Sequence, residues 1–522
     1  MKKTLAMILA IVMCLSLLAA CGGAKEEAPA AEAPKADAPA AEAPAEAPAA
    51  EAKDTLVVGI STEPTTLNPA DASLLYNDAV LRLVYDTLIR IDEDMNYLPH
   101  LAESYEAVSD TEWKFVLREG LVFSDGTPVT PADVQASIEA VNKSAAVGSF
   151  AAWYQDVEII DDRTFVIVTN APSERILYDL AQYSFVVPKK LLDEGYNFSE
   201  GPIGTGPYQL VEWKLGDRLV FKANEDYFLP EDKAAIPNLV WRIMPEGLSR
   251  TIALENGEVD FLYDVQPTDL QRLEENPDVT VYTTPYASPF YLCFNLKKPA
   301  MSDINVRKAI SAAINRDNAV LLGANGYATA NISACCPGLL GWTDENAEPY
   351  NVEKAKEYMA ASGLPEDQRD FTVITKEEPF KVALESVQAD LLEIGINLKV
   401  ELLDAGTYTA RGAAGDFDMI VGKSGVPDIL IYAATAFQSG GALNFNFLSD
   451  EYVDNLILTG LATLDETERE AIIRELVLHV DENAYRTGIY QLHTTRAYSA
   501  KLGGFETNLL SFDRVNKFYW AE

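Results

Sequence analysis

Histidine is scarce in this chain of 522 residues, which contains only three. No segment has the spacing of a CxxC knuckle or an HExxH helix, the patterns in which thiols and imidazoles hold zinc. With so few imidazoles and no thiol pair of that spacing, the sequence predicts no metal site.

Catalytic motifs are missing as well. The sequence contains no GxSxG nucleophile elbow, no phosphate-binding loop ending in GKS or GKT, and no GxGxxG between a strand and a helix. Carboxylate pairs such as "DFD" at 416–418 are common in a chain with 80 acidic residues, and most such pairs lie on the surface. We therefore predict no enzymatic activity, no catalytic residue and no cofactor.

Basic residues are outnumbered, with 41 Lys and Arg against 80 Asp and Glu, and the net charge is −39. Such a surface repels nucleic acid and anionic lipid headgroups. We expect no nucleic-acid partner, and any attachment to a membrane has to be covalent.

Only one long apolar run is present, at residues 5–20. It follows Lys2 and Lys3 and is shorter than a membrane-spanning helix of about 20 residues, an arrangement typical of a secretory signal peptide over residues 1–20. The run ends in "LAAC", which resembles the lipobox of bacterial lipoproteins. Cys21 is therefore expected to carry a lipid that anchors the chain outside the cytoplasm on the bacterial cell membrane. The alternative is an ordinary signal peptide with an unmodified Cys21.

The next segment, residues 21–53, consists almost wholly of Ala, Pro, Glu and Lys after its first residues and has no aromatic or branched apolar side chain for a core. Its prolines favour extended segments that rise about 3.1 Å per residue. We expect a disordered tether that holds the folded body away from the membrane.

The body retains three cysteines, Cys293, Cys335 and Cys336. A disulfide from Cys293 to one of the adjacent pair and three buried thiols are both compatible with the sequence.

The body alternates predicted strands and helices, which indicates a mixed α/β fold of two or three domains. Strands are expected at 55–61 and 163–170, after the glycine-rich turn within 201–213, at 218–228 as its partner, and after Gly395. Helices are expected at 73–92, 131–141, 303–320, 351–363 and 384–394. A hairpin is expected at 112–130, with Trp113, Phe115 and Leu117 on its buried face.

Several motifs in order carry a family resemblance across the body. They are "LPHLAESYEAVSDTEWKFVLREGLVFSDGTPVTPADVQASIEAV", "GTGPYQLVEW", "LENGEVDFL", "FNLKKPAMSDINVRKAISAAINRDNAV", "QADLLEIGINLKVEL" and "GDFDMIVG". Together they resemble the family 5 extracellular solute-binding proteins of ABC importers, whose best-known members bind oligopeptides, dipeptides or nickel.

This resemblance implies a two-lobe periplasmic-binding-protein-like fold of the class II type, with an extra domain inserted in the first lobe. The expected first lobe is 54–98, 201–285 and 496–522, the insertion is 99–200, and the second lobe is 286–495. It also implies a monomer that captures a small solute between closing lobes and delivers it to an ABC permease.

An oligopeptide or dipeptide is the favoured solute. A nickel chelate, an oligosaccharide or an anionic metabolite are the alternatives within the class, and a tethered surface hydrolase or an adhesin are alternatives from other classes.

The resemblance places ligand-binding residues in both lobes. In the first lobe they are Ala72, Ser73, Leu74, Tyr76, Gly204, Thr205, Gly206 and Tyr208, and at the crossing they are Tyr286, Pro289, Phe290 and Tyr291. For the two glycines a simple tight turn is the alternative, and for the crossing aromatics a core position.

The family's peptide binders carry a tryptophan and then an amine-binding aspartate after the strand that matches "FDMIVG". Here Lys423 stands near the position of the tryptophan and Val426 near that of the aspartate. Asp428 takes the place of the amine-binding aspartate only if the loop is shifted by one or two residues. Lys376 stands where dipeptide binders have a carboxylate-binding arginine. The two lysines suggest that the ligand carries a carboxylate or another anion, with solvated surface lysines as the alternative.

Overall fold

The computed structural model describes residues 53–71, 75–173, 175–425 and 428–521. The predicted signal peptide, Cys21 and all but the last residue of the tether lie outside these residues, as do Ala72, Ser73, Leu74 and Val426. No helix among the described residues is both long enough and apolar enough to cross a membrane.

One large mixed sheet runs through the body. Its strands follow the order β15-β14-β16-β12-β17-β11-β1-β10-β9-β8, and β13 also pairs with β17. Their bounds are β1 Thr55–Ile60, β8 Tyr208–Lys214, β9 Arg218–Ala223, β10 Asn238–Ile243, β11 Phe261–Leu262, β12 Val279–Phe294, β13 Ala328–Ala330, β14 Asp370–Thr375, β15 Asn397–Leu402, β16 Met419–Lys423 and β17 Arg486–Ser499.

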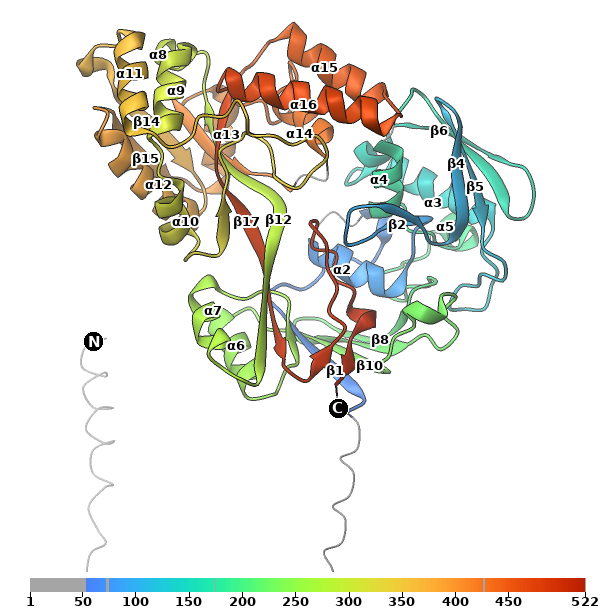
Figure 1. The fold of residues 1–522 in the computed structure, drawn as a ribbon. Coiled ribbons are helices and arrows are strands. Elements are labelled where there is room, and N and C mark those ends of the chain that lie inside the picture. Colours follow the sequence, from blue (N-terminus) through green and yellow to red (C-terminus); the bar gives the residue numbers. More distant parts are fainter. Residues whose placement is uncertain (1–52, 72–74, 174, 426–427, 522) are drawn as a thin grey trace, which may run out of the picture. The chain divides into compact units, whose positions relative to one another are not determined.

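The two longest strands, β12 and β17, pair antiparallel over most of their length. Figure 1 shows them side by side, joining the part that holds β14 and β15 to the part that holds β1 and β10. The register of β12 shifts between Pro285 and Pro289. The predicted lobe boundaries at 286 and 495 fall within these two strands, and the boundaries themselves stay a prediction.

A separate four-stranded antiparallel sheet follows the order β4-β5-β7-β6. Its strands are β4 Ala102–Ser109, β5 Glu112–Leu117, β6 Tyr154–Ile159 and β7 Thr164–Thr169, all inside the predicted insertion, whose bounds also remain a prediction. Trp113, Phe115 and Leu117 are buried, as their alternation predicts. The expected hairpin is wrong in its pairing, because β5 pairs with β4 and β7, and only one bridge, between Val122 and Pro128, closes the turn.

Three of the expected helices are present as Pro131–Lys143, Val352–Ser362 and Glu378–Leu392, and the last of these begins before the expected residue 384. The bounds of the helices are α2 Leu75–Val84, α3 Pro131–Lys143, α4 Arg175–Gln182, α5 Lys189–Glu194, α6 Gly247–Glu255, α7 Pro267–Glu274, α8 Pro299–Ser302, α9 Ile304–Ala313, α10 Arg316–Gly323, α11 Val352–Ser362, α12 Glu378–Leu392, α13 Ala405–Ala414, α14 Ile429–Ala436, α15 Glu451–Ala462 and α16 Glu466–Glu482. The helix expected at 73–92 ends at Val84, and short strands β2 (Ile89–Ile91) and β3 (Tyr97–Pro99) follow. The helix expected at 303–320 is two helices, because Asn315 caps the second of them.

Helices cover both faces of the sheet around β14 and β16. Val373 and Met419 pack into the core that contains side chains of α9 and α12, whereas Ile374 and Ile420 pack into the core that contains α14. Strands buried on both faces carry adjacent apolar residues, as Val373 and Ile374 in β14 and Met419 and Ile420 in β16 do.

The three cysteines are free and buried. Burial raises the pKa of Cys293 to about 11 and that of Cys336 to about 12, so both remain thiols at neutral pH. Of the two alternatives, the structure contains buried thiols, and the disulfide between Cys293 and the adjacent pair is not formed.

Candidate functional site

A pocket of about 710 Å³ extends from the carboxyl ends of β14 and β16 along α13 to the segment that follows β12. Strands β14 and β16 are parallel, so both end at the same edge of the sheet. Residues 375–377 and 422–424 enter the pocket from these ends, and α13 and the loop 440–448 form the remaining walls. Ligands in open α/β sheets bind at this edge, and the volume is in the usual range of about 300–1,000 Å³ for small-molecule sites.

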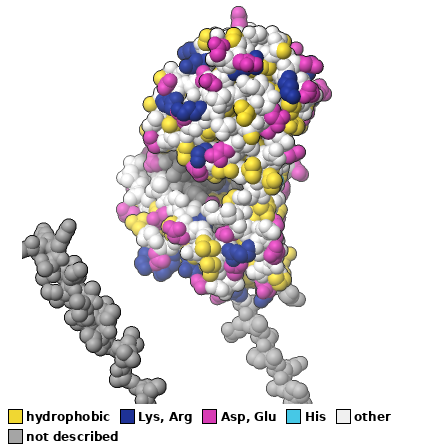
Figure 2. Space-filling view, turned by 90° about the vertical axis from the view of Figure 1, so that its left-hand side faces the viewer, with side chains coloured by type: hydrophobic (Ala, Val, Ile, Leu, Met, Phe, Trp, Pro, Cys, Tyr) yellow, Lys and Arg dark blue, Asp and Glu magenta, His cyan; other side chains and the backbone are white. Residues whose placement is uncertain are grey.

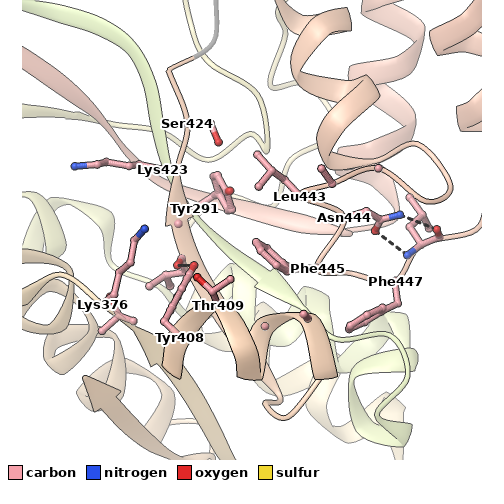
Figure 3. A pocket seen from close by; sticks show the side chains of 18 of the residues that line it. Tyr291, Lys376, Tyr408, Thr409, Lys423, Ser424, Leu443, Asn444, Phe445 and Phe447 are labelled. Carbon is pink, nitrogen blue, oxygen red and sulfur yellow. Dashed lines mark hydrogen bonds between the residues drawn. The ribbon is translucent and has the colours of Figure 1, made fainter. Parts of the chain in front are cut away.

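Aromatic side chains line much of the pocket. Figure 3 shows Tyr291, Tyr408, Phe445 and Phe447 around it, and Phe380 also contributes to the lining. Tyr408 is held in place because its hydroxyl donates to the carbonyl of Val421 at 2.8 Å. Fixed aromatic walls favour a ligand with an apolar portion.

Among the described residues, three lysines and one acid supply the charge of the lining. Lys423 Nζ lies 2.8 Å from Glu377 Oε2. Lys376 Nζ lies 5.3 Å from the ring centroid of Tyr408, and Lys297 Nζ lies 3.7 Å from that of Phe447. Within the described part of the chain Glu377 is the only acidic side chain of the lining, so the pocket carries a surplus of positive charge.

The buried guanidinium of Arg486 supports the wall behind the aromatic residues. It donates to the carbonyl of Leu443 at 2.6 Å and to Asn446 Oδ1 at 3.0 Å, and it lies 4.6 Å from the ring centroid of Tyr291. No carboxylate pairs with it among the described residues. Its contacts join β17 to the loop 440–448 and to β12, which fixes the shape of the pocket.

The structure brings Tyr291, Lys376 and Lys423 together, as the resemblance implies. Tyr286 is half-buried beside Gly425, outside the lining. Phe290 is fully buried and stacks on Phe380 with ring centroids 4.1 Å apart, so the core alternative describes it. Pro289 is likewise buried in β12 and does not line the pocket.

The residues expected to bind ligand from the segment 204–208 do not line this pocket. Thr205 is buried and donates to Asp86 Oδ2 at 2.7 Å, and the Tyr208 hydroxyl donates to the carbonyl of Ile236 at 2.9 Å. Gly206 has no positive φ, and a Cβ there would lie 2.5 Å from the carbonyl oxygen of Leu83, so close packing against α2 requires glycine. Tyr76 lies in α2.

Asp428 has a structural partner of its own. Its Oδ1 accepts from the amides of Leu430 at 2.7 Å and Ile431 at 3.1 Å, so it caps the N-terminus of α14. Burial raises its pKa above the ordinary value. The carboxylate is therefore engaged with the backbone and does not line the pocket.

Sequence reasoning missed Lys297, Tyr408, Arg486 and the loop 440–448. The sequence did contain a signal for Tyr408. It lies in α13, which begins just after β15, and β15 pairs with β14, the strand that Lys376 follows. The loop has no regular periodicity, and only the tertiary structure brings it to the strand ends.

Solved structures show the class of fold. The ABC transporter substrate-binding protein CtaP from Listeria monocytogenes matches with a TM-score of 0.81 at 23% identity, over 90% of this chain and 100% of that chain. DppA from Helicobacter pylori, in complex with the peptide STSA, matches with a TM-score of 0.72 at 23% identity, over 90% and 98% of the two chains. The periplasmic-binding-protein-like α/β fold predicted from the sequence is confirmed.

Sequence comparison shows the family. Residues 96–438 match "Bacterial extracellular solute-binding proteins, family 5 Middle", and the chain belongs to this family. It is thus a substrate-binding receptor of the ABC-importer type, and the resemblance seen in its motifs is confirmed. The glutathione-binding protein GsiB of Escherichia coli (strain K12) is 27% identical over 443 residues, 81% of this chain and 86% of that protein. The names of these relatives refer to binding, which fits the prediction that the protein has no enzymatic activity.

Proposed function

We propose that this protein captures an oligopeptide or dipeptide outside the cytoplasm and delivers it to an ABC permease, while a lipid on Cys21 holds it at the membrane. The observation that carries the proposal is the aromatic pocket at the carboxyl ends of β14 and β16, whose volume of about 710 Å³ suits a short peptide. The names of GsiB and of the DppA complex, which refer to glutathione and to the peptide STSA, support the same solute class.

Closure of two lobes on the solute accounts for capture. The lobes join through β12 and β17, and the irregular register between Pro285 and Pro289 in β12 is suited to a hinge. The face in Figure 2 is hollowed between its upper and lower parts, and acidic and basic side chains are interspersed over it. A solute that contacts both parts stabilises the closed state by its differential affinity.

Other solutes are less favoured by the pocket. No tryptophan is among its lining residues in the described part of the chain, which argues against an oligosaccharide. No group of three potential metal ligands occurs among the described residues, so nickel would have to arrive as a chelate with its own ligands. A hydrolase or an adhesin is disfavoured by membership in a family of solute-binding proteins.

Thermal melting of the full-length protein tests the solute class. The protein is unfolded and refolded to remove carried-over ligand, then melted with di- to pentapeptides, a nickel–histidine chelate and short oligosaccharides. A ligand at about 100 times its Kd stabilises by about 2.7 kcal/mol, which is visible as a rise in Tm. We expect peptides to raise Tm. A rise with the chelate or the oligosaccharides alone would contradict the peptide assignment.

A further inference from the structure

The charges in the pocket are unevenly partnered. Lys423 and Glu377 form one closed ion pair at 2.8 Å. Lys297 and Lys376 have no ion-pair partner among the described residues, and both side chains are exposed. Two unpaired ammonium groups therefore line a pocket in a chain whose net charge is −39.

The two unpaired lysines approach the pocket from separate elements. Lys376 follows β14 and Lys297 follows β12. Figure 3 shows Lys376 on one side of the pocket and Phe447, the ring on which Lys297 lies, on the opposite side, with Phe445 between them. A solute that lies along the aromatic wall thus meets a cation toward each end.

A free ammonium group finds no comparable partner. Glu377, the only acid of the described lining, is already paired with Lys423. Asp428, the acid that the sequence placed nearby, accepts two amides of α14. An ammonium group buried among lysines without an acidic partner is unfavourable, whereas a carboxylate there gains charge-assisted hydrogen bonds.

We propose that the pocket selects anionic solutes whose carboxylates are held by Lys376 and Lys297, and that it does not require a free α-ammonium group. The inference rests on the proposed function and narrows its solute class. N-acylated or acidic peptides satisfy it, as do other carboxylates with an apolar middle. The apolar middle packs against Tyr291 and Phe445.

Matched probes separate charge from shape. The refolded full-length protein is titrated calorimetrically with N-acetyl-Glu-Phe-Ala, which carries a carboxylate toward each end, with its neutral counterpart N-acetyl-Gln-Phe-Ala-amide, and with the cationic Gln-Phe-Ala-amide. We expect the anionic probe to bind at least tenfold more tightly than either of the others. Equal binding of the anionic and neutral probes, or tighter binding of the cationic probe, would overturn the inference but leave a peptide receptor in place. Binding of none of them, together with no rise in Tm from any free peptide, would overturn both.

Substitutions test whether Lys376 and Lys297 cause the preference for an anionic probe. Lys376→Met and Lys297→Met should each weaken the anionic probe by about tenfold, as expected for loss of a hydrogen bond to a charged group. Lys376→Arg should retain most of the affinity because it keeps the charge. Lys381→Met is the matched control, since Lys381 lies on α12 outside the pocket and pairs with Glu378 at 3.0 Å. Equal affinities of Lys376→Met, Lys297→Met and Lys381→Met would show that the lysines are solvated surface groups.

Discussion

At the scale of single residues, an aspartate serves either to cap a helix or to bind a ligand, and its position in the fold decides which role it has. Asp428 stands near the place where peptide-binding relatives are expected to carry an amine-binding aspartate. In the structure its Oδ1 accepts from the amides of Leu430 and Ile431. A carboxylate that satisfies the first amides of a helix is a stabilising feature, because those donors have no partner within the helix.

Substitution of Asp428 distinguishes the two roles. Asp428→Asn keeps an oxygen for the cap, so we expect the free energy of unfolding to stay within about 0.5 kcal/mol of the wild type and peptide affinity to be unchanged. Asp428→Ala removes the cap and should lower the free energy of unfolding by about 1 kcal/mol. Urea denaturation and calorimetric titration measure both quantities. Loss of free-peptide binding in Asp428→Asn alone would instead identify Asp428 as the amine partner.

At the scale of elements, Asp481 links the end of α16 to the segment that follows β13. It is buried, and its Oδ1 accepts from the amide of Ala334 at 2.8 Å. Burial is the main cause that raises its pKa to about 7, against the opposing effects of the hydrogen bonds from Ala334 and Ser333. The folded protein therefore holds a proton on Asp481 up to neutral pH.

This shift predicts a pH-dependent stability difference. The raised pKa contributes stability that is fully present below about pH 4 and is lost as pH rises through about 7. Asp481→Asn has no such proton to lose and keeps an acceptor for Ala334. We expect its free energy of unfolding, relative to the wild type, to increase from pH 4.5 to 8 in urea denaturation. Glu482→Gln, at an exposed neighbouring position, is the control. A difference for Asp481→Asn that does not vary with pH would refute the assignment.

At the scale of the whole molecule, the acidic body and the predicted N-terminal anchor complement each other. A chain with net charge −39 gains nothing from anionic lipid headgroups, so we expect any retention at a membrane to depend on a covalent lipid. A receptor held near its permease acts at a high effective concentration without spanning the membrane.

Removal of the lipid site tests this arrangement. Cys21→Ala should move most of the protein from the membrane fraction to the soluble fraction after ultracentrifugation, because the acidic body is repelled by anionic headgroups. Cys14→Ala changes a cysteine within the predicted signal peptide and should leave the protein in the membrane fraction. Equal sedimentation of both variants would indicate a different mode of attachment.

Local chemistry made much of the fold predictable. Thr130 and Asp133 form the capping interaction that "TPAD" predicts, with the amide of Thr130 donating to Asp133 at 2.8 Å. Gly395, with φ +78°, follows the end of α12 as expected. Prediction was poorer for the site. Phe290 and Tyr208 were placed there by resemblance and are core residues, because a strand position does not reveal which neighbour covers its face.

The sequence by itself determined the fold class, the family and two of the lysines in the pocket. The mixed α/β class follows from hydrophobic periodicity, caps and turn residues, which act over a few neighbouring residues. The family and the lysines follow from the resemblance that several motifs carry in order along the body. Only the tertiary structure decided that Asp428 is a cap, that Thr205 binds Asp86, and that Lys297 and Lys376 enter one pocket. Contacts between segments far apart in the chain depend on packing, and packing leaves no local pattern from which they can be predicted.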